Sequence, residues 1–333
     1  MMKLRTALIL ILPLILLLSC RHREQRWSRV DVSTIPLEKI TIRRYEKAVF
    51  NVDRNNLRDG LKRLAVHYSV FLQDNLDTLK LIHISEYLDD PVIQDVYHAT
   101  MSKYPALDDI EDQLTTAFKY VVHYFPSEHI PQVYSYISGL DYQEPVLYND
   151  SALVIALDIY LDPDYDVYQK LGLPEYIIRR FDKRYLVRDC IDEMMSVQLR
   201  TPAPGNTLLD RMMYEGKRLL LLDAILPEIP DTIKIRYTPV QLEWCKKNES
   251  NLWKFMIQNN LLYSTDNQII NKFFVDGPFT SGFEGSPSRL GSWLGWQIIR
   301  AYMDHHADIS LPVLITETDS QKILMDSGYK PAR

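Results

Sequence analysis

The chain has 333 residues, of which 46% are hydrophobic and 25% are charged. This composition can support a sizeable core, and it excludes a mainly disordered, collagen-like or disulfide-scaffold protein. The formal net charge of −6 offers no basic field for nucleic acid, so we expect no nucleic-acid partner.

The N-terminal segment has the pattern of a secretory signal. Lys3 and Arg5 form a basic start, and residues 7–18 are apolar, with Pro13 among them. A run of this length is too short to span a bilayer comfortably, which takes roughly 20 residues, and it fits the apolar region of a signal peptide. We therefore predict that residues 1–19 are removed from the mature chain.

The apolar run ends in Leu-Leu-Ser-Cys at Cys20, which is typical of the lipobox of a bacterial lipoprotein. Cys20 would carry the lipid, and residues 20–35 would form a tether. Several acyl chains anchor a protein stably in a membrane, because each buried CH₂ contributes about 0.8 kcal/mol. Arg21 replaces the aspartate of the usual inner-membrane retention signal. We predict a lipid-anchored cell-envelope protein that faces the periplasm, with the outer membrane favoured.

Periodicity and capping residues predict one α+β domain over residues 36–333, predominantly helical, with a small mixed sheet. Residues 38–45 and 130–161 would supply most of the sheet, with a loop or hairpin connection over 141–150. Residues 232–237 read as a short strand or an extended connection. Helices are predicted over 51–66, from Pro91 onward, and over 108–124, 175–199, 207–226, 238–262 and 289–305.

Motifs of common enzyme and metal sites are absent from the sequence or incomplete. It has no nucleotide-binding loop, nucleophile elbow or closely spaced cysteine pair typical of a zinc site. Residues 162–166 resemble the start of a calcium-binding loop, but Val167 stands where glycine is needed and Leu173 where a bidentate glutamate is needed. We interpret this segment as a solvated acidic turn.

Two cysteines remain in the mature chain besides the lipid-bearing one. Cys190 and Cys245 could pair in an oxidising compartment, or they could be two buried small hydrophobic residues. We favour unpaired thiols.

A glycine-rich segment that begins at Asp276 leads into a helix with two tryptophans. The candidates for a cleft wall or docking surface there are Arg289, Trp293 and Trp296. Alternatively, Gly291 and Gly295 share one helix face through their i, i+4 spacing and allow close packing of another helix, which we favour.

Several motifs together resemble the GldB-type gliding motility lipoproteins. They are the lipobox at Cys20, Tyr124–Pro126, Pro131–Gly139, Ala156–Leu161, the helix around Trp253 with Leu261–Asp266, Ser286–Gln297 and Tyr329–Pro331. The resemblance covers nearly the whole mature chain. It implies a membrane-anchored lipoprotein that works with other envelope proteins of the gliding and type IX secretion apparatus. Family members also occur in bacteria that do not glide, so motility of the host is not implied.

The same family is similar, more remotely, to zinc metallopeptidases of the gluzincin kind, which implies a zincin-like fold. Their His-Glu-x-x-His motif places two zinc ligands one helical turn apart, and a glutamate from the next helix is the third ligand. Here the helix expected to hold the motif reads Arg-Asp-Cys-Ile-Asp-Glu over residues 188–193. Arg188 and Asp192 then replace the histidines, and Asp189 replaces the general base. Glu215 is the best match to the third ligand.

The substitutions speak against zinc catalysis. An arginine at a ligand position repels zinc, and it could pair with Asp192 on the same helix face instead. We therefore expect no cofactor and a protein that is not an enzyme. The acidic residues Asp189, Asp192, Glu193 and Glu215 could still form a cluster that binds a partner, or they could be salt-bridged or solvated helix faces, which we favour.

The sequence thus predicts a non-catalytic, lipid-anchored component of a gliding or secretion-associated envelope machine. One alternative is a zinc-dependent peptidase or an enzyme of altered chemistry in the same fold. Another is a peptide- or glycan-binding lipoprotein that uses an aromatic cleft near Trp293 and Trp296.

Overall fold

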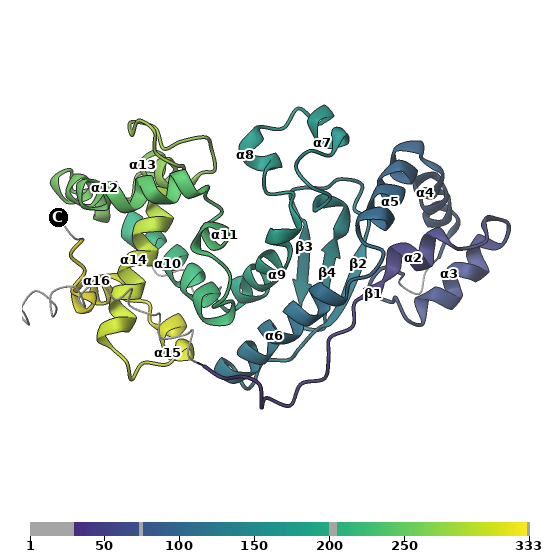
Figure 1. The fold of residues 1–333 in the computed structure, drawn as a ribbon, viewed down its shortest axis with the longest axis horizontal. Helices are drawn as coiled ribbons and strands as arrows, with labels where there is room; N and C mark the ends of the chain where they lie inside the picture. The colour runs from purple at the N-terminus through teal and green to yellow at the C-terminus, as the bar shows by residue number, and fades with distance from the viewer. Residues whose placement is uncertain (1–29, 73–75, 200–204, 332–333) are drawn as a thin grey trace, which may run out of the picture. The chain divides into compact units, whose positions relative to one another are not determined.

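The computed structural model describes residues 30–72, 76–199 and 205–331 (Figure 1). The chain divides into two units, Met1–Asp31 and Val32–Arg333, and every element below belongs to the second unit. The predicted signal peptide and the lipid attachment at Cys20 lie outside the described residues. None of the helices described is both long and apolar enough to cross a membrane.

Within the described residues, four strands form one mixed sheet in the order β1-β2-β4-β3. The strands are β1 Arg43–Arg44, β2 Gln132–Tyr136, β3 Val146–Asn149 and β4 Ala152–Ala156. β1 and β4 both run parallel to β2, whereas β3 pairs antiparallel with β4 and forms one edge. Every residue of β4 is buried, because this run of apolar and β-branched residues is covered on both faces.

Helices make up most of the rest of the chain, which confirms the predicted α+β class with a predominance of helix. They are α2 Tyr45–Phe50, α3 Leu57–Ala65, α4 Thr78–Asp89, α5 Pro91–Lys103, α6 Asp108–Tyr124, α7 Asp166–Lys170, α8 Glu175–Ile178, α9 Lys183–Gln198, α10 Leu208–Ile225, α11 Asp231–Ile235, α12 Pro239–Gln258, α13 Asn267–Phe274, α14 Leu290–His305, α15 Leu311–Thr316 and α16 Ser320–Ser327. Single 3₁₀ turns are η3 Arg54–Asn56, η4 Leu157–Ile159 and η5 Leu261–Tyr263.

Two segments are less extended than the sequence indicates. The strand expected over 40–45 is reduced to β1, because side chains of α6 take the backbone donors that precede it. Thr115 Oγ1 accepts from the Ile40 amide and Glu111 Oε1 accepts from the Ile42 amide, both at 2.9 Å.

The segment 232–237, expected to be a strand or an extended connection, contains most of α11 instead. Pro230 takes the N-cap position in an extended conformation, and the acidic Asp231 begins the helix, where it complements the helix dipole. Arg236 ends the helix in the left-handed conformation, with φ of 60°. This short helix turns out to be central to the candidate site.

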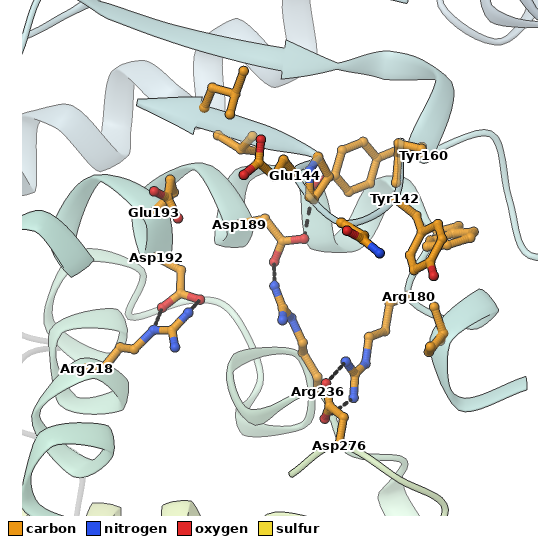
Figure 2. A pocket seen from close by; sticks show the side chains of 17 residues that line it. Tyr142, Glu144, Tyr160, Arg180, Asp189, Asp192, Glu193, Arg218, Arg236 and Asp276 are labelled. Carbon is orange, nitrogen blue, oxygen red and sulfur yellow. Dashed lines mark hydrogen bonds and ion pairs between the residues drawn. The ribbon is translucent and has the colours of Figure 1, made fainter. Parts of the chain in front are cut away.

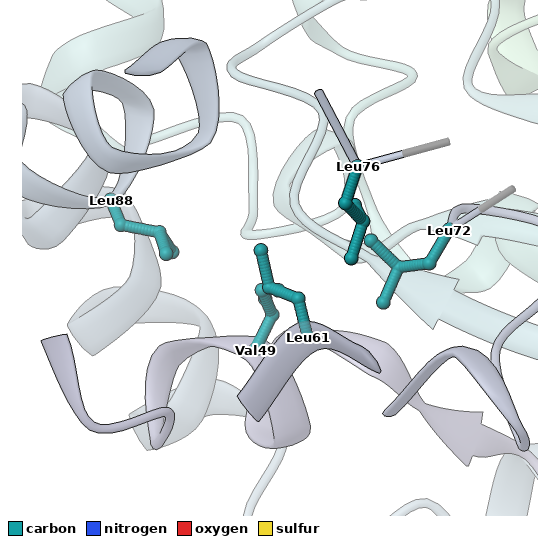
Figure 3. Close-up of a cluster of buried hydrophobic side chains, with 5 residues drawn as sticks. All are labelled: Val49, Leu61, Leu72, Leu76 and Leu88. Atoms are coloured by element: carbon teal, nitrogen blue, oxygen red, sulfur yellow. The ribbon is translucent and has the colours of Figure 1, made fainter. Parts of the chain in front are cut away.

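A small apolar cluster joins α2, α3 and α4 (Figure 3). Its buried members are Val49, Leu61, Leu72, Leu76 and Leu88. The rings of Tyr45 and Phe71 stack against it with centroids 4.1 Å apart. This cluster gives the N-terminal helices an apolar centre of their own.

Helices α10 and α14 lie side by side and pack closely (Figure 1). A Cβ on Gly295 would collide with the backbone carbonyl of Met212, and a Cβ on Gly216 would collide with the carbonyl of Gly295. The close-packing interpretation of Gly295 is therefore confirmed. Gly291 packs against Phe274 and the backbone of Phe273 in the same way.

The less favoured alternative, in which Trp293 and Trp296 line a cleft or docking surface, is wrong. Their side chains are 2% and 0% exposed, because the close approach of α10 and α14 places both rings in the core. Trp296 Nε1 donates to Asp223 Oδ2 at 2.9 Å. Cys190 in α9 and Cys245 in α12 are free and buried, which confirms the prediction of unpaired thiols.

Candidate functional site

A pocket of about 490 Å³ opens between the edge strand β3, helices α9 and α10, and the segments around Phe181 and Asp276 (Figure 2). Three predicted residues of α9 line it, namely Asp189, Asp192 and Glu193. The helix that the sequence singled out therefore forms one wall of a pocket.

Asp192 is the most strongly paired carboxylate of the pocket. It accepts from Arg188 Nη1 at 2.5 Å, from Arg218 Nε at 2.5 Å and from Arg218 Nη2 at 2.6 Å. The predicted i, i+4 pair of Arg188 with Asp192 is thus confirmed. Burial alone would raise the pKa of Asp192, but the two guanidinium groups outweigh it and hold the pKa well below its usual range.

Asp189 forms a second ion-paired centre one turn earlier in α9. Its Oδ1 accepts from Arg236 Nη2 at 2.6 Å and from Arg188 Nη1 at 3.1 Å, and its Oδ2 accepts from the hydroxyl of Tyr160 at 3.1 Å. Arg188 is 3% exposed and bridges both carboxylates. Its guanidinium lies between the two acids and partly neutralises both.

Glu215 joins the same network from α10, although it does not line the pocket. It pairs with Arg211 Nη2 at 3.1 Å and with Arg218 Nη1 at 3.7 Å. Arg218 therefore links Glu215 to Asp192. The structure brings Arg188, Asp189, Asp192 and Glu215 together as an ion-pair network in which arginines separate the acids, and Glu193 lines the pocket beside them.

The C-terminal end of α11 is held by three arginines from other parts of the chain. The carbonyls of residues 234, 235 and 236 accept from Arg188 Nε at 3.0 Å, Arg289 Nη2 at 2.6 Å and Arg179 Nη2 at 3.3 Å, respectively. These bonds satisfy carbonyls that a helix end leaves without partners. They also fix Arg236 in the conformation that directs its side chain to Asp189.

The far end of the pocket is bounded by Asp276, which lies between α13 and α14. Arg180 forms a bidentate pair with it, with Nη1–Oδ2 at 2.7 Å and Nη2–Oδ1 at 2.8 Å. Arg289 Nε lies 2.8 Å from the same Oδ1. Burial would raise the pKa of Asp276, but the bond from Arg180 and the charge of Arg289 hold it well below its usual range.

Of the cleft residues predicted from the glycine-rich segment, Arg289 therefore does reach this site, whereas the two tryptophans do not. Sequence reasoning missed Arg180, Arg218, Arg236 and Asp276. Their partners are far away in sequence, for example 96 positions for Arg180 and Asp276. An i, i+3 relation between Glu215 and Arg218 is the one local signal that could have pointed to this set.

Arginines hold the pKa values of Asp192 and Asp276 well below their usual range. A carboxylate whose pKa is held far below neutrality is a poor general base. Across the described ranges, no group of three or more histidine, cysteine or acidic side chains is placed to hold a metal ion. In the predicted acidic turn, Asp162 pairs with Lys103.

A larger cavity of about 680 Å³ lies between α6, α9 and the connection from α10 to α11. Its lining is mostly apolar and contains none of the predicted site residues. The ion-paired pocket is therefore the candidate site that the sequence and the structure share.

The fold and the site define an α+β protein with a pocket in which arginines pair with Asp189, Asp192 and Asp276. The family described as "Gliding motility protein GldB" matches residues 25–331, so the chain belongs to this family of gliding motility lipoproteins. No curated protein and no solved structure matches the chain. The similarity to zinc metallopeptidases accordingly stays a prediction.

Proposed function

We propose that the protein is a non-catalytic, lipid-anchored component of the gliding or type IX secretion machinery of the cell envelope. Its ion-paired pocket binds an extended polypeptide segment of another envelope protein. The proposal that the protein is non-catalytic rests on the position of Arg188, whose guanidinium bridges Asp189 and Asp192. Membership of the gliding motility family supports the cellular context.

The edge strand β3 supports binding of an extended segment. The Ala156 amide donates to the Pro145 carbonyl at 2.9 Å, so these two residues form a hydrogen-bonded pair. In the antiparallel register, hydrogen-bonded and non-hydrogen-bonded pairs then alternate along β3. The backbone groups of Val146 and Tyr148 consequently point away from β4, at the open edge of the sheet. Residues 144–147 line the pocket, so an extended segment that enters it can pair with this edge.

The anchor is proposed from the sequence, since Cys20 lies outside the described residues. A lipid on Cys20 would hold the pocket close to the membrane surface through a tether that ends at residue 35. This places the binding site within reach of membrane-bound components of an envelope machine, with the outer membrane favoured and the pocket on the periplasmic side.

Metal content of the native lipoprotein tests the non-catalytic part. The lipidated chain, purified in detergent without chelator, should contain no stoichiometric zinc by mass spectrometry and should not cleave a peptide library. About one zinc per chain that is lost in Glu215→Gln would overturn the proposal. Glu284→Gln is the matched control, because Glu284 is an exposed acid outside the pocket.

A further inference from the structure

At the far end of the pocket, the carboxylate of Asp276 lies against the guanidinium group of Arg180 (Figure 2). Both oxygens bind Arg180 in the planar fork geometry with which arginine recognises carboxylates. Arg289 Nε lies 2.8 Å from one of these oxygens as an ion pair, without the geometry of a hydrogen bond. The geometry of this end is thus already complementary to a carboxylate, and an acid of the chain itself fills it.

Positive charge is in excess at this end. Arg180 and Arg289 share the carboxylate of Asp276, while the neighbouring Arg179 donates to the carbonyl of Arg236 and to an amide oxygen, which are neutral acceptors. The pKa of Arg289 is lowered to about 10, mainly by burial and secondly by the charge of Arg180. In the described part of the chain, Arg180 also keeps a buried Nε–H without a hydrogen-bond partner. Two guanidinium groups at this end therefore share a single carboxylate.

Asp276 lies on a lightly packed segment. It is 41% exposed, and the nearby Val275 and Phe279 are each 58% exposed. Gly277 follows directly, and the nearest atom that a Cβ on it would meet is 3.7 Å away. Few buried apolar contacts hold this segment, so its backbone can shift with little loss of packing.

We propose that Arg180 and Arg289 form a carboxylate-binding subsite, that Asp276 occupies it in the unliganded protein, and that the carboxylate of a bound peptide takes its place. The inference rests on the peptide binding proposed above and adds the chemical group that is recognised. Tyr142 lies beside Arg180 in the pocket, and Phe181 also lines it, so an aromatic residue next to the carboxylate fits this pocket.

Three acetylated tripeptides, titrated into the lipidated chain in detergent, test the proposal. They are Ac-Ala-Tyr-Ala with a free C-terminus, its C-terminal amide, and the amide Ac-Ala-Tyr-Asp, which carries its carboxylate on a side chain. Calorimetry on Asp276→Asn should show binding of a carboxylate-bearing peptide about tenfold tighter than on the unchanged chain, because the internal competitor is gone. Binding of the peptide with the free C-terminus, or of the amidated peptide with the aspartate, shows whether the subsite recognises a C-terminal or a side-chain carboxylate.

Matched variants separate this effect from general electrostatics. Glu284→Gln removes a negative charge from an exposed position of the same loop and should leave the affinity unchanged. Adding Arg180→Gln to Asp276→Asn should abolish the gain. Asp276→Ser removes the same carboxylate by a different side chain, and circular dichroism verifies that each variant is folded.

Binding of the neutral amide as tight as that of the acids would overturn the subsite, as would an equal gain in Glu284→Gln. Absence of binding by either acid to both folded Asp276 variants would also overturn it. Such a result would leave the non-catalytic function standing, because that function is tested separately by zinc content and peptide cleavage.

Discussion

Replacing Arg188 by methionine tests whether the ion pairs hold the pocket together. Arg188 and Asp192 are 3% and 2% exposed, and their closest atoms are 2.5 Å apart. Removal of one partner of a buried pair typically costs about 3–5 kcal/mol, because the other charge is left without compensation. Arg218 still binds Asp192 in the variant, so we expect the lower end of this range, about 3 kcal/mol.

The assay is urea unfolding followed by circular dichroism, with the free energy compared at equal m-values. Arg184→Met is the matched control, because Arg184 lies on the same helix, is 70% exposed and pairs with Asp182. An exposed pair of this kind contributes less than about 1 kcal/mol. A cycle with Asp192→Asn should show non-additive costs, since both residues belong to one network. If Arg188→Met costs no more than Arg184→Met, the reasoning is refuted.

Three further outcomes are expected. The low pKa of Asp192 contributes stability that is present above the unfolded-state pKa of about 3.9 and is lost as pH falls below it. Below this pH, the free energy of unfolding should therefore fall less steeply with decreasing pH in Asp192→Asn than in the unchanged chain. An equal slope in the two chains would contradict this. Gly295→Ala should cost about 1–3 kcal/mol in urea unfolding because its Cβ meets the carbonyl of Met212. Gly277→Ala, whose Cβ would make only an ordinary van der Waals contact, should cost clearly less. Equal costs would exclude the clash as the cause. Cys20→Ser should move the chain from the membrane to the soluble fraction and abolish incorporation of labelled palmitate; retention in the membrane would disprove anchoring through Cys20.

Local patterns predicted the elements whose limits depend on local chemistry. α6 has the expected bounds, because acids fill its first turn and Phe125 takes the C-cap before Pro126. The close packing at Gly295 and the pair of Arg188 with Asp192 also follow from helical spacing alone. Each of these features joins residues within one element or one helix face.

Features that depend on distant partners escaped prediction. α11 has the alternating pattern of a strand, yet three arginines from elsewhere in the chain bind its terminal carbonyls and support a helix. The two tryptophans look like exposed aromatic residues beside a flexible loop, and the approach of α10 buries them. The pair of Arg180 with Asp276 likewise exists only once the fold brings α8 next to the loop after α13.

Site-specific photo-crosslinking in native membranes tests the central claim, that the pocket binds another envelope protein without catalysis. A photoreactive residue at Leu147, which is 41% exposed on β3, should give one specific protein adduct. The same residue at Val240, 79% exposed on α12 and outside the pocket, should not give that adduct. Identical adducts from both positions, or no adduct from Leu147 together with peptide cleavage by the purified chain, would contradict the account.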